Sequence, residues 1–214
     1  MDVLLTVLLL CLMAYQVTGE ALHEWLGVGM TVLLIVHHGL NRKWYAALFK
    51  GTYNAYRIVT AAVNTLLLAT IALTASCGMA MSAHAVPFLY GMAPMGFVRQ
   101  AHLACSYWSF VLMGFHIGLH LPAITAKVKP NRTAKIICTV WFTALAGTGL
   151  YLFIQNGIPD YLFFRTHFAF LDYDKAAVPV FLENTAGEFF FAFLGANAVR
   201  LIRPAHKKSN QIPG

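Results

Sequence analysis

The chain has 214 residues, of which 59% are hydrophobic and only 11% are charged. Because soluble domains carry about a quarter of charged residues, this composition excludes an ordinary water-soluble domain, and the apolar runs leave no length for a separate catalytic domain. The formal net charge of +7 lies in short clusters between these runs, which indicates membrane topology and argues against nucleic-acid binding.

Six apolar runs follow one another and predict a single membrane domain over residues 1–214, an all-α bundle of six transmembrane helices. The expected helices cover residues 3–17, 21–40, 58–81, 101–126, 136–154 and 179–202. The first run has no basic flank on its N-terminal side, so we interpret it as a helix and not as a signal peptide. The sixth is the weakest, because Glu183 and Glu188 lie near its start.

Basic residues recur in alternate connections between the runs. Cytoplasmic loops carry an excess of Lys and Arg, so these connections and both termini are expected on the cytoplasmic side of the inner membrane. The connections after the first and third runs share a single base, Arg99, and are expected outside. The basic residues of the expected inner side are Arg42, Lys43, Lys50, Arg57, Lys127, Lys129, Arg132, Lys135, Arg200, Arg203, Lys207 and Lys208.

Residues 155–182 are expected on the outer side, before the last helix. Aromatic side chains alternate there with acidic ones such as Asp160, Asp172 and Asp174. Such a mixture is typical of a segment at the membrane interface, with a lid or a docking surface as the alternative.

Histidines are the residues that point to chemistry, because ionisable residues within membrane spans are costly and functional by default. His23 and His37 lie 14 residues apart in the second run, and His102 and His116 lie 14 apart in the fourth. Fourteen residues turn a helix to within about 40° of its starting direction and advance it by about 21 Å. Each pair therefore faces one way, with one histidine near each edge of a hydrocarbon core about 30 Å thick.

One span separates the two histidine-bearing helices, so they run parallel. His23 is then expected at the depth of His102, and His37 at the depth of His116. Two imidazoles that face each other can hold a haem iron from both axial sides. The pattern predicts two non-covalent b-type haems, an outer one on His23 and His102 and an inner one on His37 and His116. Iron with two protein ligands favours electron transfer over oxygen chemistry.

Glycines accompany the four histidines. Gly27 lies one turn from His23, and Gly114 and Gly118 flank His116. Glycine lets a flat macrocycle approach the backbone closely, so all three are predicted to line the haem sites. The alternative is ordinary close packing of membrane helices.

Three further polar residues belong to the predicted site. Arg99 lies at a depth where it can neutralise haem propionates, with snorkelling to the interface as the alternative. His38 could replace His37 as a ligand, since 15 residues also end within about 60° of the start. His120, one turn beyond His116, is a candidate for a propionate or for a quinone head group.

The segments HEWLG (23–27) and HHGLN (37–41), followed by Trp44, resemble the flavinylation-associated cytochrome family of small membrane cytochromes. The repeated histidine pair is also similar to the haem core of the cytochrome b subunit of bc complexes. The resemblance is strongest over residues 18–46, recurs over 102–120 and is weak beyond residue 135. It implies b haem on the four histidines and partnership with an extracytoplasmic flavoprotein, since this chain has no flavin motif of its own.

The sequence thus predicts a diheme b-type cytochrome that passes electrons across the membrane, between a quinol/quinone or another carrier and a partner redox protein, as a subunit of an oxidoreductase. One alternative is a transporter of a divalent metal. It requires acidic residues at mid-depth, whereas Glu20, Glu24, Glu183 and Glu188 are all expected near the edges. The other alternative is a non-redox anchor subunit, which requires no fixed histidine spacing.

Overall fold

The computed structural model describes residues 1–125, 131–166 and 168–202. Helices make up 82% of the structure, and the described residues contain no strand, as expected for an all-α chain. In chain order the elements are α1 (Asp2–Met13), α2 (Tyr15–Leu40), α3 (Arg42–Leu48), α4 (Ala55–Met81), the 3-10 turn η1 (Pro87–Leu89), α5 (Met95–Thr125), α6 (Arg132–Gln155), α7 (Ile158–Leu162) and α8 (Ala177–Ile202).

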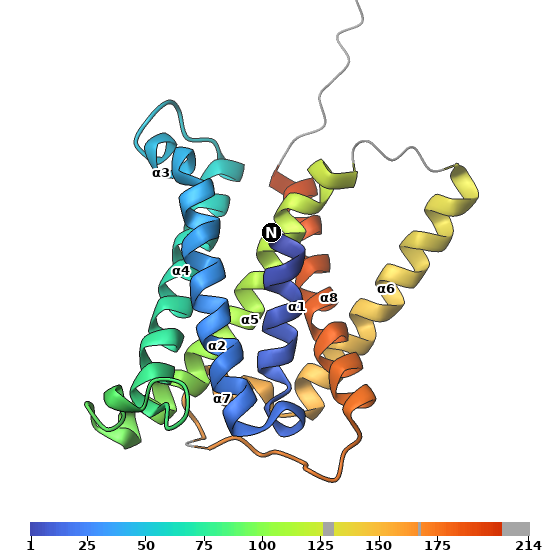
Figure 1. Cartoon of the computed structure of the whole chain (residues 1–214). Coiled ribbons are helices and arrows are strands. Elements are labelled where there is room, and N and C mark those ends of the chain that lie inside the picture. The colour runs from blue at the N-terminus through green and yellow to red at the C-terminus, as the bar shows by residue number, and fades with distance from the viewer. Residues whose placement is uncertain (126–130, 167, 203–214) are drawn as a thin grey trace, which may run out of the picture.

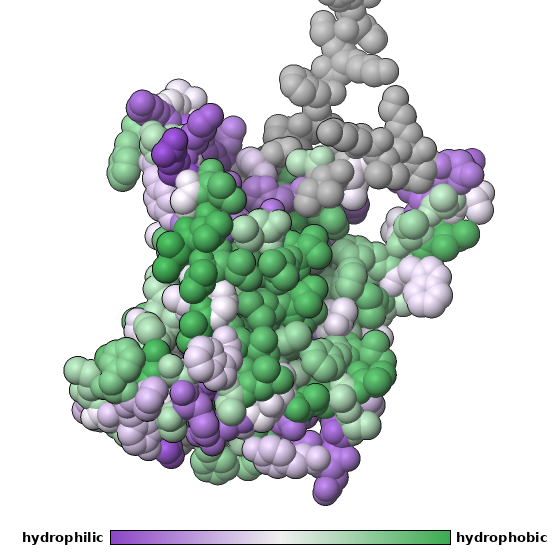
Figure 2. All heavy atoms as spheres, in the orientation of Figure 1, coloured by the Kyte–Doolittle hydropathy of each residue, from purple (hydrophilic) through white to green (hydrophobic). Residues whose placement is uncertain are grey.

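Four of these helices, α2, α4, α6 and α8, are long and apolar enough to cross a membrane. Their apolar residues are largely exposed, and only 6% of the most apolar stretch of α2 is buried within the protein. Figure 2 shows hydrophobic side chains as a band between two hydrophilic ends. Lipid is the solvent that suits such a surface, so the chain is a multi-pass membrane protein.

The long helices run alternately up and down in one bundle (Figure 1). As a result α2 and α5 point the same way. The central helix α5 packs along α4 on one side and α8 on the other, while α6 packs on α8 and α1 pairs with α2. We call the two ends of the bundle the α3 end and the α7 end, after the short helices that lie there.

The first expected helix is too short to be a full span, so the expected count of six full spans is corrected here. It ends at Met13 instead of residue 17, because the backbone turns at Ala14 and again at Gly19, where φ is +69°. With 12 residues, α1 covers about 18 Å, whereas a span needs about 20 residues. The other five expected helices are present and begin up to six residues earlier than expected.

The segment between α6 and α8 lies at the α7 end, and its helix α7 packs against α5. Tyr161 of α7 stacks on Tyr107, with ring centroids 4.6 Å apart, and the Trp108 indole donates a hydrogen bond to the Leu162 carbonyl at 3.0 Å. Beyond α7 the aromatic side chains of Phe168, Phe170 and Tyr173 are exposed. One part of the segment is thus anchored in the bundle and the other part has the exposed aromatic surface of an interfacial segment.

Some residues of the sequence analysis lie outside the described part of the chain. They are Lys127, Lys129, Arg203, Lys207 and Lys208. The described basic residues of the expected inner side all lie at the α3 end, in or next to α3, α4, α6 and α8. Arg99, Arg165 and Lys175 lie at the α7 end.

Candidate functional site

His23 of α2 and His102 of α5 face each other near the α7 end. Their ring centroids are 6.2 Å apart, and the ring planes are inclined by 72°. The placement follows from the parallel course of α2 and α5, which brings residues near the start of both helices to one depth. The His23 ring also contacts Tyr15, with centroids 5.0 Å apart.

The distance between these rings fits a metal held from both sides. A bond between a metal and an imidazole nitrogen is about 2.0 Å long, so two axial nitrogens lie about 4 Å apart and their ring centroids about 6 Å apart. Each ring can rotate about its own bond to the metal, so an inclination of 72° is compatible with this arrangement. The pair therefore fits the two axial ligands of a haem.

His102 is held in one orientation by α4. Its Nδ1 lies 2.9 Å from the Thr74 carbonyl oxygen, which can only accept a hydrogen bond. The proton is therefore on Nδ1, and Nε2 is the nitrogen that can bind a metal. A β-carbon on Gly78, one turn further along α4, would lie 3.2 Å from His102 Cε1. Gly78 is thus a glycine that makes room for a histidine, a role that its position in the sequence does not reveal.

His116 is held by α4 in the same manner, nearer the α3 end. Its Nδ1 lies 2.8 Å from Asn64 Oδ1. His37 of α2 lies within electrostatic reach of His116, and its Nδ1 is 3.2 Å from Asp2 Oδ1 of α1. The structure thus anchors His116 as it anchors His102, whereas His37 lies beside the Asp2 carboxylate and its ring contacts His38. Among the described residues no ring contact joins His37 to His116, so the second pair stays a prediction.

His38 and His120 make contacts of their own near the α3 end. His38 Nδ1 lies 2.5 Å from the Tyr45 hydroxyl in α3, so this side chain is turned toward the helix end. His120 packs on His116 with ring centroids 4.7 Å apart. His120 is thus next to the predicted inner site, whereas His38 belongs to the junction of α2 and α3. Arg99 is exposed, three residues before His102.

Two of the predicted site glycines have another role. A β-carbon on Gly114 would lie 2.7 Å from that of Phe191 and 2.9 Å from the Glu188 carbonyl oxygen, and one on Gly118 would strike the Ala192 backbone. Both therefore serve close packing of α5 on α8, which was the alternative given for them. The third, Gly27, has nothing within 4 Å of its β-carbon position. Its role stays a prediction.

Glu24, directly after His23, connects α2 to the turn that follows α4. Its carboxylate accepts hydrogen bonds from the Ser82 hydroxyl at 2.8 Å and from three backbone amides, those of Ala83, His84 and Ala85, at 2.7 to 3.0 Å. Glu20, Glu24 and His84 could also hold a metal ion, since one ligand atom of each lies within 4.8 Å of the others. The Glu24 oxygens, however, are already engaged by these four donors.

Glu188 is at mid-depth, which corrects its expected place near a membrane edge. Since α8 begins at Ala177, Glu188 lies about 17 Å into the helix. It is 5% exposed, and neither carboxyl oxygen has a hydrogen-bond partner among the described residues. Its carboxyl carbon would lie 3.4 Å from a β-carbon on Gly114, on the side of α5 nearly opposite to His116. Glu188 and the histidines thus belong to different faces of α5.

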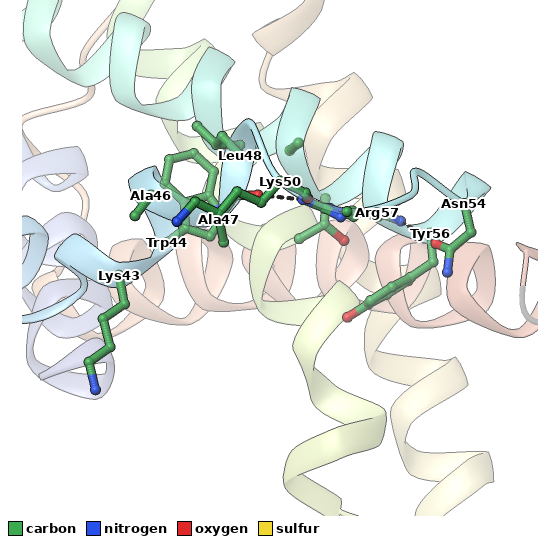
Figure 3. A pocket seen from close by; sticks show the side chains of 12 residues that line it. Lys43, Trp44, Ala46, Ala47, Leu48, Lys50, Asn54, Tyr56 and Arg57 are labelled. Atoms are coloured by element: carbon green, nitrogen blue, oxygen red, sulfur yellow. Dashed lines mark hydrogen bonds between the residues drawn. The ribbon is translucent and has the colours of Figure 1, made fainter.

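An open pocket of about 760 Å³ lies between α3 and the start of α4 (Figure 3). Arg57 is one of the residues that line the pocket. The Arg57 guanidinium donates hydrogen bonds to the carbonyls of Ala47 and Lys50, and to that of Thr52 at 3.0 Å. The same group lies 4.2 Å from the centre of the Tyr53 ring. These bonds close the turn between the two helices, so we interpret the pocket as part of that turn.

Three residues help to hold the histidine-bearing helices or side chains in place, and these roles were not predicted from the sequence. Asn64 carries a usable signal, because an amide within an apolar run requires a partner. Thr74 acts through its backbone and has no such signal. Glu24 was noted only for its charge, since its donors are 58 to 61 residues away in the chain.

The chain was also compared with known proteins. No model of a protein family matches it, and neither a curated protein nor a solved structure does.

Proposed function

We propose that the chain is a diheme b-type cytochrome that passes electrons across the membrane. The observation that carries the proposal is the pair of His23 and His102, whose rings are 6.2 Å apart while Nδ1 of His102 is fixed by a backbone carbonyl. A haem bound there would supply an iron that takes up and releases one electron at a time.

His37 and His116 are the ligands of the second haem in this proposal. Support comes from the hydrogen bond of His116 to Asn64 and from the position of His37 on the helix that also carries His23. Anchored imidazoles keep their ring orientation when a metal binds, which lowers the cost of forming the site. The electrons would come from a quinol or another carrier and pass to a partner redox protein, in either direction.

For the membrane topology we propose that α5, with 31 residues, crosses together with α2, α4, α6 and α8. Helix α1 would not cross the membrane. It would extend from the depth of His37, beside Asp2, to the α7 end. Seven described basic residues at the α3 end, against three at the α7 end, support a cytoplasmic α3 end in the inner membrane. The α7 end would then face an extracytoplasmic flavoprotein, a partner suggested by the resemblance of the histidine segments to the flavinylation-associated cytochromes.

The haem content of the purified protein tests the proposal. We expect about two b-type haems per chain in a pyridine haemochrome assay, and one in each of the variants His23→Ala and His102→Ala. His84→Ala is the matched control, because His84 lies at the same end and is held through its backbone; it should keep both haems. A wild-type protein without haem, expressed with sufficient haem supply, or equal loss of both haems in either variant, would contradict the pairing.

A further inference from the structure

The two histidines of α5 differ in what holds them. Both donate from Nδ1 to α4, but His102 donates to the backbone carbonyl of Thr74 and His116 to the side chain of Asn64. A backbone carbonyl stays the same whatever residue occupies position 74. The acceptor at position 64, in contrast, is set by the residue type.

We propose that Asn64 is a positioning residue that sets the redox potential of the haem held by His37 and His116, separately from that of the other haem. The inference rests on the proposed function. A stronger acceptor on Nδ1–H makes an imidazole a better electron donor to its metal, and this stabilises the oxidised iron. An amide oxygen is a moderate acceptor, between a carboxylate and no acceptor at all.

Several hydroxyl side chains of α4 do not reach α5. The hydroxyls of Thr70, Thr74 and Ser76 donate to carbonyls of their own helix, and Thr60 Oγ1 has no partner among the described residues. Asn64 instead reaches across to α5. Burying an amide in an apolar span is unfavourable unless the amide has a hydrogen-bond partner. The hydrogen bond with His116 gives the Asn64 amide such a partner.

The other titratable groups near His116 are His120, His37 and Asp2. Asp2 lies beside His37, and the His120 ring packs at a tilt against the His116 ring. The hydrogen bond at His116 Nδ1 belongs to Asn64. A change at position 64 therefore alters that bond and leaves the three neighbours in place.

The test uses the full-length holoprotein with Asn64→Asp, Asn64→Leu and the control Thr70→Ala. Each substitution is made alone and together with His102→Ala, which leaves only the inner haem. Redox titrations give the potential of each haem, and electron paramagnetic resonance reports its axial ligand field. Asn64→Asp should favour the oxidised inner haem and Asn64→Leu the reduced one, each by about tenfold in the equilibrium constant, or about 59 mV for one electron. Thr70→Ala should shift neither haem, because the Thr70 hydroxyl bonds only a carbonyl of its own helix.

A shift of both haems, or shifts of the same sign with Asp and Leu, would overturn the inference, because a general loss of structure acts in that way. Unchanged potentials with two haems bound would reject the role of Asn64 and leave the proposed function standing. Wild-type protein without haem would reject both. If Asn64→Leu does not accumulate, the nearly isosteric Asn64→Asp decides the question by the sign of its shift.

Discussion

A single carboxylate connects two helices beside the proposed outer site. Glu24 accepts one hydroxyl and three amide hydrogen bonds from residues 82–85, and it follows His23 directly in α2. Since few other contacts join α2 and α4, this carboxylate fixes how α2 stands relative to the α4 turn. The position of His23 therefore depends on a bond network outside the histidine pair.

We expect Glu24→Ala to lower stability, because it leaves the buried Ser82 hydroxyl and the half-buried Ala85 amide without their acceptor. Hydrogen bonds to a charged group contribute about 1.5 to 3 kcal/mol each, so a loss of roughly 3 kcal/mol in the free energy of unfolding is expected. In the proposed diheme protein, the outer haem should be lost before the inner one. Thermal unfolding in detergent, followed by haem absorbance, measures both effects. Glu20→Ala, one turn earlier on α2, is the control, and an equal effect of the two substitutions would speak against the network.

At the level of single residues, spacing was the informative signal. The interval of 14 residues places each histidine pair on one face, and the structure brings His23 and His102 together. Spacing could not distinguish glycines that face a cofactor from those that face a neighbouring helix, because this depends on how far α5 is rotated toward α8. For that reason the sequence left both roles open for Gly114 and Gly118, and the structure shows their contact with α8.

At the scale of helices, small residues determine how closely α5, α6 and α8 approach. A β-carbon on Gly149 of α6 would strike the Ala186 backbone of α8, whereas one on Gly147 has nothing within 4 Å. In lipid, helix association depends on such close packing and not on water exclusion. The two glycines thus form a matched pair, one at the crossing of α6 and α8 and one on the exposed side.

Gly149→Leu is expected to separate α6 from α8 and to destabilise the bundle by about 3 kcal/mol or more, since the obstructing atoms belong to the backbone. Gly147→Leu should be close to neutral. The melting temperatures of the two variants in the same detergent give the comparison. A neutral Gly149→Leu would mean that α6 does not cross α8 as described.

The positions of the helices were predictable, because a long apolar run with a capping residue before it fixes where a helix begins to within a few residues. Asn54 and Asn131, for example, accept amide hydrogen bonds at the starts of α4 and α6, and both helices begin near the expected residues. The early end of α1 was not predictable, since Ala14 and Tyr15 are not helix-breaking residues. The turn there depends on how α1 packs against α2.

For the whole molecule, the uneven distribution of Lys and Arg sets the expected orientation. A fluorescent protein fused to the C-terminus should fluoresce, and alkaline phosphatase at the same place should be inactive, because the first folds in the cytoplasm and the second only outside it. The reverse result would place the α3 end outside. A phosphatase inserted after Met92, in the turn before α5, is the control for the opposite face.

The buried carboxyl of Glu188 has a consequence for biosynthesis. Helix α8 has the lowest mean hydropathy of the four apolar helices, 1.2 against 2.0 for α4, and both Glu188 and the Asn184 amide one turn earlier lack partners among the described residues. A helix with these groups facing lipid enters a bilayer reluctantly. The groups are shielded only once α5 and α6 stand beside α8. The last helix would thus insert into a bundle that its predecessors have already formed, so that assembly of this protein ends with α8.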